Sequence, residues 1–358
     1  MRIATVPLFD AVESRFVRET LAEAFSSLPG HSGGIVQVSA ETFAGSSSFA
    51  TGRLLVEFGD GSHLSIFAKD LNPDFQLAEA RATRAPGLAR SRREVWMYEQ
   101  VLPALELGTP RHYATRWDVE HGRYWLFLED VGPKRLSRLG ERSLWLQSAD
   151  WLARFHAATR FAVSPRGELA EFDVSRFHDV GDRLEPVMTR LPEEDRLRLE
   201  RAAHLTDDLL TYLSSTATGM FHGEFFGKNI VVRRGAAEES IAVIDWETAG
   251  FGPQLIDLAS ICAGRWNDSQ RVEMRRAYLE RLAKESEDAP GWAEFTATMD
   301  AVAVLNALAW LSWWADGDDE HVLRWMREVR MTLDVWERPD ATRAGGARST
   351  KRRGRLRA

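Results

Sequence analysis

Two short motifs in the second half of the chain constrain its fold more than any other feature. The first, His-Gly-Glu-Phe-Phe-Gly-Lys-Asn at 222–229, places the carboxylate of Glu224 and the amide of Asn229 five residues apart. The second is Asp-Trp-Glu at 245–247; it follows the apolar run 241–244, and its Asp245 lies sixteen residues after Asn229. This pattern predicts one polar site built from two neighbouring segments.

The spacing of these groups fits the chemistry of phosphoryl transfer. That reaction needs a carboxylate near the attacking hydroxyl and oxygen ligands that hold Mg²⁺ against the nucleotide phosphates. Kinase catalytic loops space a base and a metal-binding Asn in this way, and a metal-binding Asp lies on a later element. The sequence therefore predicts Glu224 as the catalytic base, and Asn229 and Asp245 as metal ligands.

This part of the chain resembles the aminoglycoside phosphotransferase/choline kinase-like family, small-molecule relatives of the protein kinases. The family's His-Gly-Asp, four residues and Asn, followed by Ile-Asp-Trp/Phe, match residues 221–229 and 243–247, and its Gly-Pro and Asp-Leu-Ala stretch matches 252–259. Here Glu224 stands where most members have Asp, and the chain resembles a subset with His-Gly-Glu in the catalytic loop. The resemblance covers roughly residues 40–335.

The resemblance implies an α+β, two-lobed protein-kinase-like fold. Residues 1–131 would form an N-terminal nucleotide-binding lobe made of an antiparallel sheet and a helix. Residues 132–340 would form a mostly helical C-terminal lobe for catalysis and acceptor binding. Residues 341–358 are rich in Gly, Arg and Ser, and we expect them to be a basic disordered tail.

The N-terminal part of the sequence shows elements in the order that such a fold requires. Periodicity predicts a leading helix over 8–28, strands over 35–43, 51–58 and 64–69, and a helix over 92–102 that Pro103 ends. The resemblance assigns Lys69 to the nucleotide phosphates and pairs it with Glu94, with Glu99 as the alternative. Backbone groups of a small-residue turn would hold the phosphates, and those of a strand end near 130 would bond the adenine. The residues are Gly45, Ser46, Ser47 and Ser48 in the turn, and Glu129 and Val131 at the strand end.

Three further residues near the motifs have roles that the sequence leaves more open. By the resemblance, His222 braces the catalytic loop by bonding nearby backbone. Lys228 either neutralises the transferring phosphate or is a surface lysine. Glu247 either faces the acceptor pocket or has a structural role.

Charge and cysteine content limit the partners of the folded part. The net charge is −7, but the tail after Asp340 carries +7, so residues 1–340 carry −14. An acidic body disfavours nucleic acid as a partner and suits a cationic substrate. The single Cys262 excludes an intrachain disulfide, which fits a cytoplasmic protein. No uninterrupted apolar run reaches the ~18 residues of a membrane span, so we expect no membrane partner.

Two functions from different classes fit these observations. The first is an ATP-dependent phosphotransferase, with GTP not excluded, that uses Mg²⁺ and acts on a hydroxyl of a small molecule. Sugars, amino alcohols, aminoglycosides and other natural products are all open as acceptors. The alternative is a nucleotide-binding pseudokinase with little transfer activity, which the change from Asp to Glu224 favours.

Overall fold

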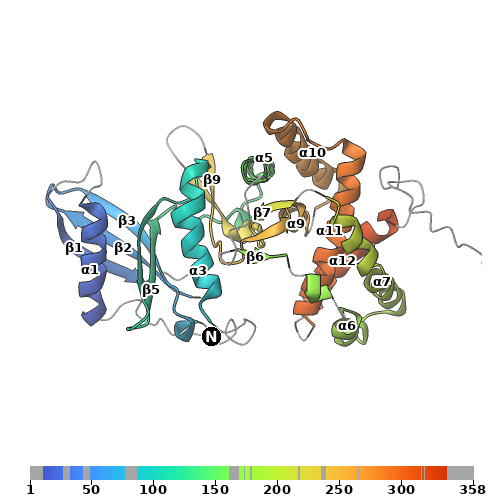
Figure 1. Ribbon diagram of the computed structural model, residues 1–358, viewed down its shortest axis with the longest axis horizontal. Coiled ribbons are helices and arrows are strands. Elements are labelled where there is room, and N and C mark those ends of the chain that lie inside the picture. The colour runs from blue at the N-terminus through green and yellow to red at the C-terminus, as the bar shows by residue number, and fades with distance from the viewer. Residues whose placement is uncertain are drawn as a thin grey trace, which may run out of the picture. The chain divides into compact units, whose positions relative to one another are not determined.

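The chain divides into two compact units, each made from two separate stretches of sequence. The computed structural model describes residues 11–26, 33–42, 49–76, 87–160, 169–172, 174–177, 180–216, 218–234, 239–264, 266–315, 317 and 319–336. Unit 1 comprises Met1–Phe172 and Gly219–Gly252, and unit 2 comprises Asp173–Thr218 and Pro253–Ala358. Figure 1 shows the elements of both units.

Unit 1 begins with a five-stranded sheet in which all neighbouring strands are antiparallel. The strands follow the order β1-β2-β3-β5-β4. Their bounds are β1 (Ile35–Thr42), β2 (Ala50–Phe58), β3 (His63–Asp70), β4 (His112–Asp118) and β5 (Arg123–Glu129). The turn between β2 and β3 contains Gly61 at φ 81°, a left-handed conformation that glycine adopts without strain. Asp-Gly, the dipeptide at 60–61, is typical of such hairpin turns.

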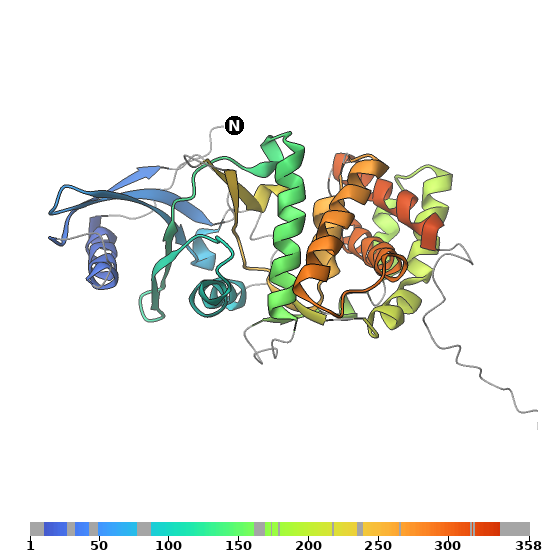
Figure 2. The same cartoon turned by 90° about the horizontal axis from the view of Figure 1, so that it is seen from above.

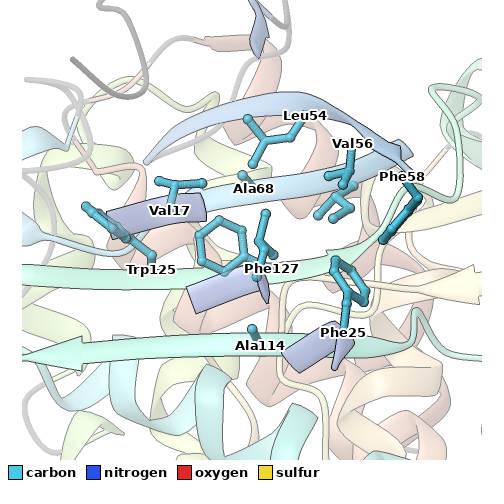
Figure 3. Packing of buried hydrophobic residues seen from close by; sticks show 11 residues of the cluster. Val17, Phe25, Leu54, Val56, Phe58, Ala68, Ala114, Trp125 and Phe127 are labelled. Carbon is cyan, nitrogen blue, oxygen red and sulfur yellow. The ribbon is translucent and has the colours of Figure 1, made fainter. Parts of the chain in front are cut away.

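Helix α1 (Ala11–Phe25) covers one face of this sheet (Figure 1). Its residues Val17, Leu21 and Phe25 recur at helical spacing and are buried. They pack against alternate residues of the strands, where side chains of one face lie two residues apart. Figure 3 shows this core, whose sheet residues are Leu54, Val56, Phe58, Ile66, Ala68, Ala114, Trp125 and Phe127. Because neighbours along a strand point to opposite faces, Lys69 lies on the face opposite Ala68.

The helix predicted over 92–102 is longer than expected and does not end at Pro103. It runs from α3 (Ala89–Trp96) through a π-helical turn (Met97–Val101) into α4 (Leu102–Leu105), and ends at Glu106 with φ 50°. Pro103 lies in the first turn of α4, where a missing N–H is tolerated. The wider π turn before it, in which Leu102 N–H bonds the carbonyl of Met97, absorbs the change of hydrogen-bond pattern.

The rest of unit 1 contains one long helix and short strands, and the two sequence motifs at 222–229 and 245–247 lie among these strands. Helix α5 (Arg142–Thr159), drawn in green in Figure 2, precedes them. Strands β8 (Ile230–Arg234) and β9 (Glu239–Val243) pair as an antiparallel hairpin. A second small sheet has the order β6-β10-β7, with β6 (Ala170–Glu171), β7 (Thr218–Phe221) and β10 (Gly250–Pro253).

Unit 2 is built from helices around a central one. The central helix is α11 (Trp292–Trp313), which packs against several other helices of the unit. The helices are α6 (Val180–Met188), α7 (Glu193–His204), α8 (Thr206–Leu213), α9 (Leu255–Cys262), α10 (Asp268–Glu285), α11 (Trp292–Trp313) and α12 (Asp319–Trp336). Among the described residues, α11 alone is long and apolar enough to cross a membrane by length and composition. Polar residues interrupt the apolar runs of this helix, so the sequence did not single it out as long enough for a membrane span. Since 78% of its apolar window is buried, α11 fits the core helix of unit 2.

The predicted α+β fold, an antiparallel sheet with helices followed by a mostly helical part, is confirmed. The three strands predicted over 35–43, 51–58 and 64–69 begin and end within two residues of those bounds, as β1, β2 and β3. The division into lobes at residues 131–132 stays a prediction; the contact-based units have other limits. The turn with Gly45, Ser46, Ser47 and Ser48 and the tail 341–358 lie outside the described residues.

Candidate active site

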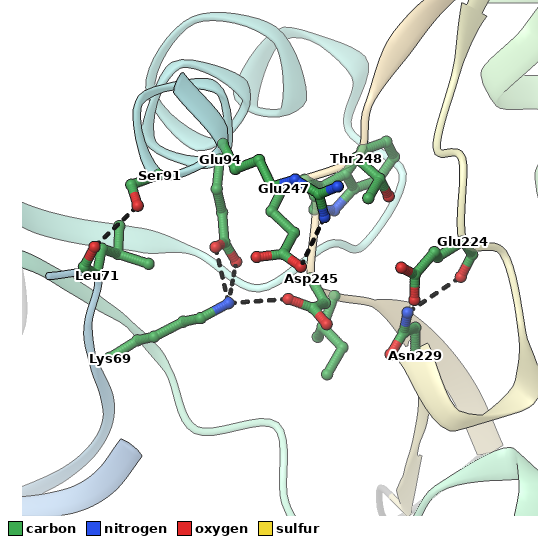
Figure 4. A network of polar contacts seen from close by, with 12 residues as sticks. Lys69, Leu71, Ser91, Glu94, Glu224, Asn229, Asp245, Glu247 and Thr248 are labelled. Atoms are coloured by element: carbon green, nitrogen blue, oxygen red, sulfur yellow. Dashed lines mark hydrogen bonds and ion pairs between the residues drawn. The ribbon is translucent and has the colours of Figure 1, made fainter. Parts of the chain in front are cut away.

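The centre of the candidate site is a buried lysine surrounded by three carboxylates. Lys69 Nζ donates to both oxygens of Glu94, at 3.0 and 2.7 Å, and to Oδ1 of Asp245 at 2.8 Å (Figure 4). The third carboxylate is that of Glu247, and oxygens of Glu94, Asp245 and Glu247 lie within 4.8 Å of one another. Strand β3, helix α3 and the segment after β9 each contribute to this cluster. All its members belong to unit 1.

The charges of this cluster shift one another's pKa. Burial lowers the pKa of Lys69, but Asp245, Glu94 and Glu247 raise it more, so the net shift is upward and the ammonium is retained. Burial raises the pKa of Glu94 to about 7, although Lys69 opposes the shift. Burial alone would raise the pKa of Asp245, but the adjacent ammonium of Lys69 lowers it well below its usual range. Lys69 thus contacts the carboxylates of Glu94 and Asp245, while that of Glu247 lies 3.9 Å from the guanidinium of Arg90.

The turn that carries Asp245 has an unusual backbone. The strand before it buries Ile241, Ala242 and Val243, and Asp245 then adopts φ 69°, in the left-handed region that Asp enters more readily than most residues. Trp246, which follows, is fully buried and packs on the ring of His222 with centroids 4.6 Å apart. The buried tryptophan anchors the turn, so the side chain of Asp245 is aimed toward Lys69.

His222 holds the catalytic loop to this turn. Its Nε2 donates to the carbonyl of Ile244 at 3.0 Å, and its Nδ1 accepts from the N–H of Glu224 at 3.2 Å. These two bonds require the ring proton on Nε2, and the ring is fully buried. The structural geometry is what the predicted bracing role of His222 requires.

Gly223 is a residue of the loop that has no room for a side chain. Its φ is 85°, and a Cβ atom would lie 2.5 Å from the carbonyl oxygen of Thr248. Thr248 in turn donates its hydroxyl to the carbonyl of His222 at 2.9 Å. The loop and the turn after Asp245 therefore touch backbone to backbone at this point, which explains the glycine of the His-Gly-Glu motif.

Glu224 and Asn229 lie next to each other in the loop. The side-chain amide of Asn229 donates to the carbonyl of Glu224 at 3.0 Å (Figure 4), and the carbonyl of Asn229 accepts from the N–H of Ile244 at 3.0 Å. Lys228 Nζ donates to Oε2 of Glu224 at 2.8 Å, with 59% of the lysine side chain exposed. Lys228 is thus an exposed lysine whose contact is with the predicted base.

Phe225 anchors the catalytic loop to helix α5. The sequence analysis did not single out this residue. Its side chain is fully buried and stacks on Trp151 of α5, with centroids 5.8 Å apart and planes 13° apart. Trp151 also contacts Trp246 at 6.4 Å. One tryptophan of α5 therefore supports both motif segments. The two successive phenylalanines of the loop gave no signal for which of them would be buried.

The strand end predicted to bond adenine has its side chains committed to structural contacts. Glu129 binds the guanidinium of Arg233 at 3.0 Å, and its N–H donates to the carbonyl of Arg111 at 2.8 Å. That N–H is therefore engaged within the protein. Asp130 accepts from Ser65 Oγ at 2.7 Å and from Arg53. Val131 follows at the start of the turn that leaves β5. Their roles toward adenine stay predictions.

The donor atoms present fit a hard divalent cation. Asp245 offers a carboxylate, and the amide of Asn229 uses its nitrogen on Glu224, which leaves its oxygen as the potential ligand atom. Oxygen ligands of this kind suit Mg²⁺.

The structure thus brings together Lys69, Glu94 and Asp245 in one cluster, and Glu224, His222 and Asn229 in the adjoining loop. Glu94 and not Glu99 reaches the lysine; Glu99 lies 3.9 Å from His112 instead. Glu247 joins the lysine cluster, a position that its sequence neighbourhood did not reveal. The catalytic and binding roles of all these residues stay predictions.

Comparisons with known proteins show the family and the fold of the chain. A family model described as "Phosphotransferase enzyme family" matches residues 74–297. Among solved structures, a microcompartment-associated aminopropanol kinase is similar with 17% identity and a TM-score of 0.59, over 89% of this chain and 97% of that one. An ethanolamine kinase of Plasmodium vivax has 11% identity and a TM-score of 0.54, over 93% and 91%. The GDP complex of aminoglycoside 2'-phosphotransferase-IIIa has 11% identity and a TM-score of 0.56, over 90% and 98%. A comparison with curated proteins gave no match.

Proposed function

The chain belongs to the phosphotransferase enzyme family, and on that premise we propose that it transfers the γ-phosphoryl group of ATP to a hydroxyl of a small molecule. One observation carries the proposal: Lys69 bonds both Glu94 and Asp245 beside a loop that presents Glu224 and Asn229. The nucleotide of the transfer is ATP, with GTP as the alternative. The GDP bound by the structural neighbour supports a nucleotide in this fold.

Each group of the site has a proposed task. Lys69, oriented by Glu94, binds the nucleotide phosphates. Asp245 and the amide oxygen of Asn229 hold Mg²⁺, which supplies charge neutralisation at the phosphates when bound. Glu224 accepts or orients the proton of the attacking hydroxyl. His222 keeps the loop in register with Asp245 through the carbonyl of Ile244.

The acceptor is a small hydroxyl compound, and the charge of the chain favours one that carries amino groups. Residues 1–340 carry a net charge of −14, and an acidic body attracts cations over a distance. The amino alcohols and the aminoglycoside named for the similar structures are compounds of this class. We place the enzyme in the cytoplasm because its one cysteine makes no disulfide.

One contact favours a second function, that of a nucleotide-binding protein with little transfer. Lys228 occupies Oε2 of Glu224 at 2.8 Å. An ammonium that stayed there would compete for the proton-accepting oxygen. In that case nucleotide and Mg²⁺ would bind, but phosphoryl transfer would not follow.

The test measures ADP and GDP release over a panel of amino alcohols, aminoglycosides and sugars. We expect acceptor-dependent release by the wild type, and its loss in Asp245→Ala, since the variant lacks a charged metal ligand. Asn229→Ala should weaken the Mg²⁺ dependence less, because an amide carries no charge. The matched control is Asp208→Asn on the exposed face of α8.

The outcomes separate the two functions. Equal turnover by the wild type and Asp245→Ala would reject the assignment of the site. Nucleotide binding without release for any acceptor would favour the second function. Phosphorus NMR of the product identifies the hydroxyl that receives the phosphate.

A further inference from the structure

Helix α3 contacts the candidate site through more than its glutamate. Five consecutive side chains, 90–94, make a contact each. Ser91 Oγ donates to the carbonyl of Leu71, just after β3, at 2.8 Å (Figure 4). Arg92 lies over the ring of Trp117 in β4 at 5.9 Å. The remaining contacts of the five go to Lys69 and to Glu247.

Arg93 contacts the backbone of the turn that carries Asp245. Its guanidinium donates through one terminal nitrogen to the carbonyl of Glu247 at 2.7 Å. The group is partly buried, and burial together with Arg90 lowers its pKa. A hydrogen bond from a charged guanidinium is shorter and stronger than one between neutral groups. The contact therefore restrains the backbone two residues after Asp245.

The turn has reason to need such a restraint. Asp245 is a non-glycine residue at φ 69°, a strained conformation that persists only where surrounding contacts hold it. Trp246 holds the turn from the side of the loop. Arg93 holds it from the side of α3, and the next residue of the helix, Glu94, holds Lys69. One helix thus fixes both the ammonium and the turn.

We propose that Arg93 is a positioning residue, which sets the place of the Asp245 carboxylate by bonding the carbonyl of Glu247. The inference rests on the proposed function, because it concerns the metal ligand Asp245. A shift of a reacting or binding group by ~1 Å costs up to ~10²-fold in rate. Loss of the bond should therefore affect metal binding and turnover more than folding.

The experiment compares Arg93→Met, Arg93→Lys and the control Arg92→Met. The control removes the guanidinium of Arg92, which belongs to the same helix. That group lies over the ring of Trp117, and the contacts described for it do not include Glu94, Asp245 or Glu247. Manganese binding in the presence of a non-hydrolysable ATP analogue is measured by electron paramagnetic resonance. The Mg²⁺ dependence and kcat of turnover, and the Tm, are measured in parallel.

We expect Arg93→Met to weaken manganese binding about 10-fold and to lower kcat by up to about 10²-fold, with a change in Tm no larger than that of Arg92→Met. Arg93→Lys, which keeps a charged donor, should recover part of both. Manganese affinity and kcat equal to those of Arg92→Met would overturn the inference. If Arg93→Met does not fold, Arg93→Lys decides, since wild-type affinity and kcat together with a lowered Tm would show a structural role only.

The failure of the inference differs from the failure of the proposed function. A wild type that binds no manganese–nucleotide complex overturns the proposed function and this inference with it. A wild type that binds the complex, with Arg93→Met binding equally well, overturns the inference alone.

Discussion

The carboxylate of Glu224 reaches further from the backbone than an aspartate would. The loop keeps the backbone of residue 224 close to Asn229 and His222, so the extra methylene moves only the carboxylate. That carboxylate meets Lys228, four residues on, at 2.8 Å. The lysine is largely exposed, and screened pairs of this kind contribute little stability. Lys228 can therefore leave when a substrate hydroxyl arrives.

The first prediction at the residue scale concerns Glu224, the proposed base. We expect Glu224→Gln to leave nucleotide binding unchanged and to lower kcat by about 10²–10⁴-fold, because the amide cannot accept the proton. Glu224→Asp should also slow transfer, since it withdraws the carboxylate by about 1.5 Å. The measurement is kcat with the true acceptor, with calorimetry for the nucleotide.

Two results would change this reading of Glu224. A faster Glu224→Asp variant would show that the longer side chain is a weakened base. Unchanged kcat in both variants would remove Glu224 from the chemistry. Lys228→Met is the companion variant, and it should leave kcat within a few-fold of wild type if the lysine moves aside.

A second residue-scale prediction concerns Gly223. We expect Gly223→Ala to destabilise the protein by more than the about 1–3 kcal/mol of a left-handed non-glycine residue, because the added Cβ would lie 2.5 Å from the carbonyl oxygen of Thr248. Chemical denaturation measures the free energy of unfolding. The control is Gly140→Ala, where a Cβ meets no atom within 4 Å. Equal stability of the two variants would contradict the tight contact.

Sequence reasoning reached the polar residues of the site, including His222, which braces the loop, but it missed Phe225 and Arg93. Lys69, Glu94 and Asp245 come together as the family resemblance implied. Phe225 acts by stacking on Trp151 in the interior, and Arg93 acts by donating to the carbonyl of Glu247. Such contacts depend on which side of a loop or helix faces the neighbour, and a hydrophobic or basic residue type alone does not report that side.

At the scale of elements, the clearest lesson concerns α3 and its continuation. Proline at position 103 predicted a helix end, but the chain inserts a π turn before it and continues to Leu105. The periodicity of apolar residues cannot reveal a single wider turn, because it changes the register by only one residue. The glutamate of the site lies before the π turn, so its register was still predicted correctly.

The pair of Arg271 and Glu328 joins elements within unit 2. The guanidinium of Arg271 on α10 binds both oxygens of Glu328 on α12, at 2.6 and 2.8 Å, and both side chains are buried. Glu328 also accepts from the N–H of Gly264, after the end of α9, at 3.1 Å. Three segments therefore meet at one ion pair.

The element-scale prediction is that breaking this pair costs much of the stability of the protein. We expect Glu328→Gln to destabilise it by about 3–5 kcal/mol, because Arg271 would remain buried without a counter-charge. The control, Glu285→Gln, breaks a contact of α10 with both partners about one-third exposed and should cost at most about 1 kcal/mol. Urea denaturation of both variants checks this; a cost below that of the control would contradict it.

At the scale of the whole molecule, the sequence predicted a sheet-containing part and a helical part. It did not predict which segments of the chain belong to each compact unit. Periodicity predicted individual strands and helices, and the family resemblance implied the antiparallel sheet and the mostly helical part. The compact units, however, exchange segments at residues 172, 219 and 252, and no change of composition marks these places. Contacts between distant segments decide such limits, and a single sequence does not contain them.

The interleaving of the units has a consequence for the chain while it is being synthesised. Lys69 and Glu94 are 25 residues apart and can meet early, whereas Lys69 and Asp245 are 176 residues apart. At a translation rate of about 5–20 residues per second, Asp245 is synthesised roughly 10–35 s after Lys69. In a nascent chain, Lys69 can pair with Glu94 first. The segment that carries Asp245 must be synthesised before the lysine acquires all its contacts of the folded protein.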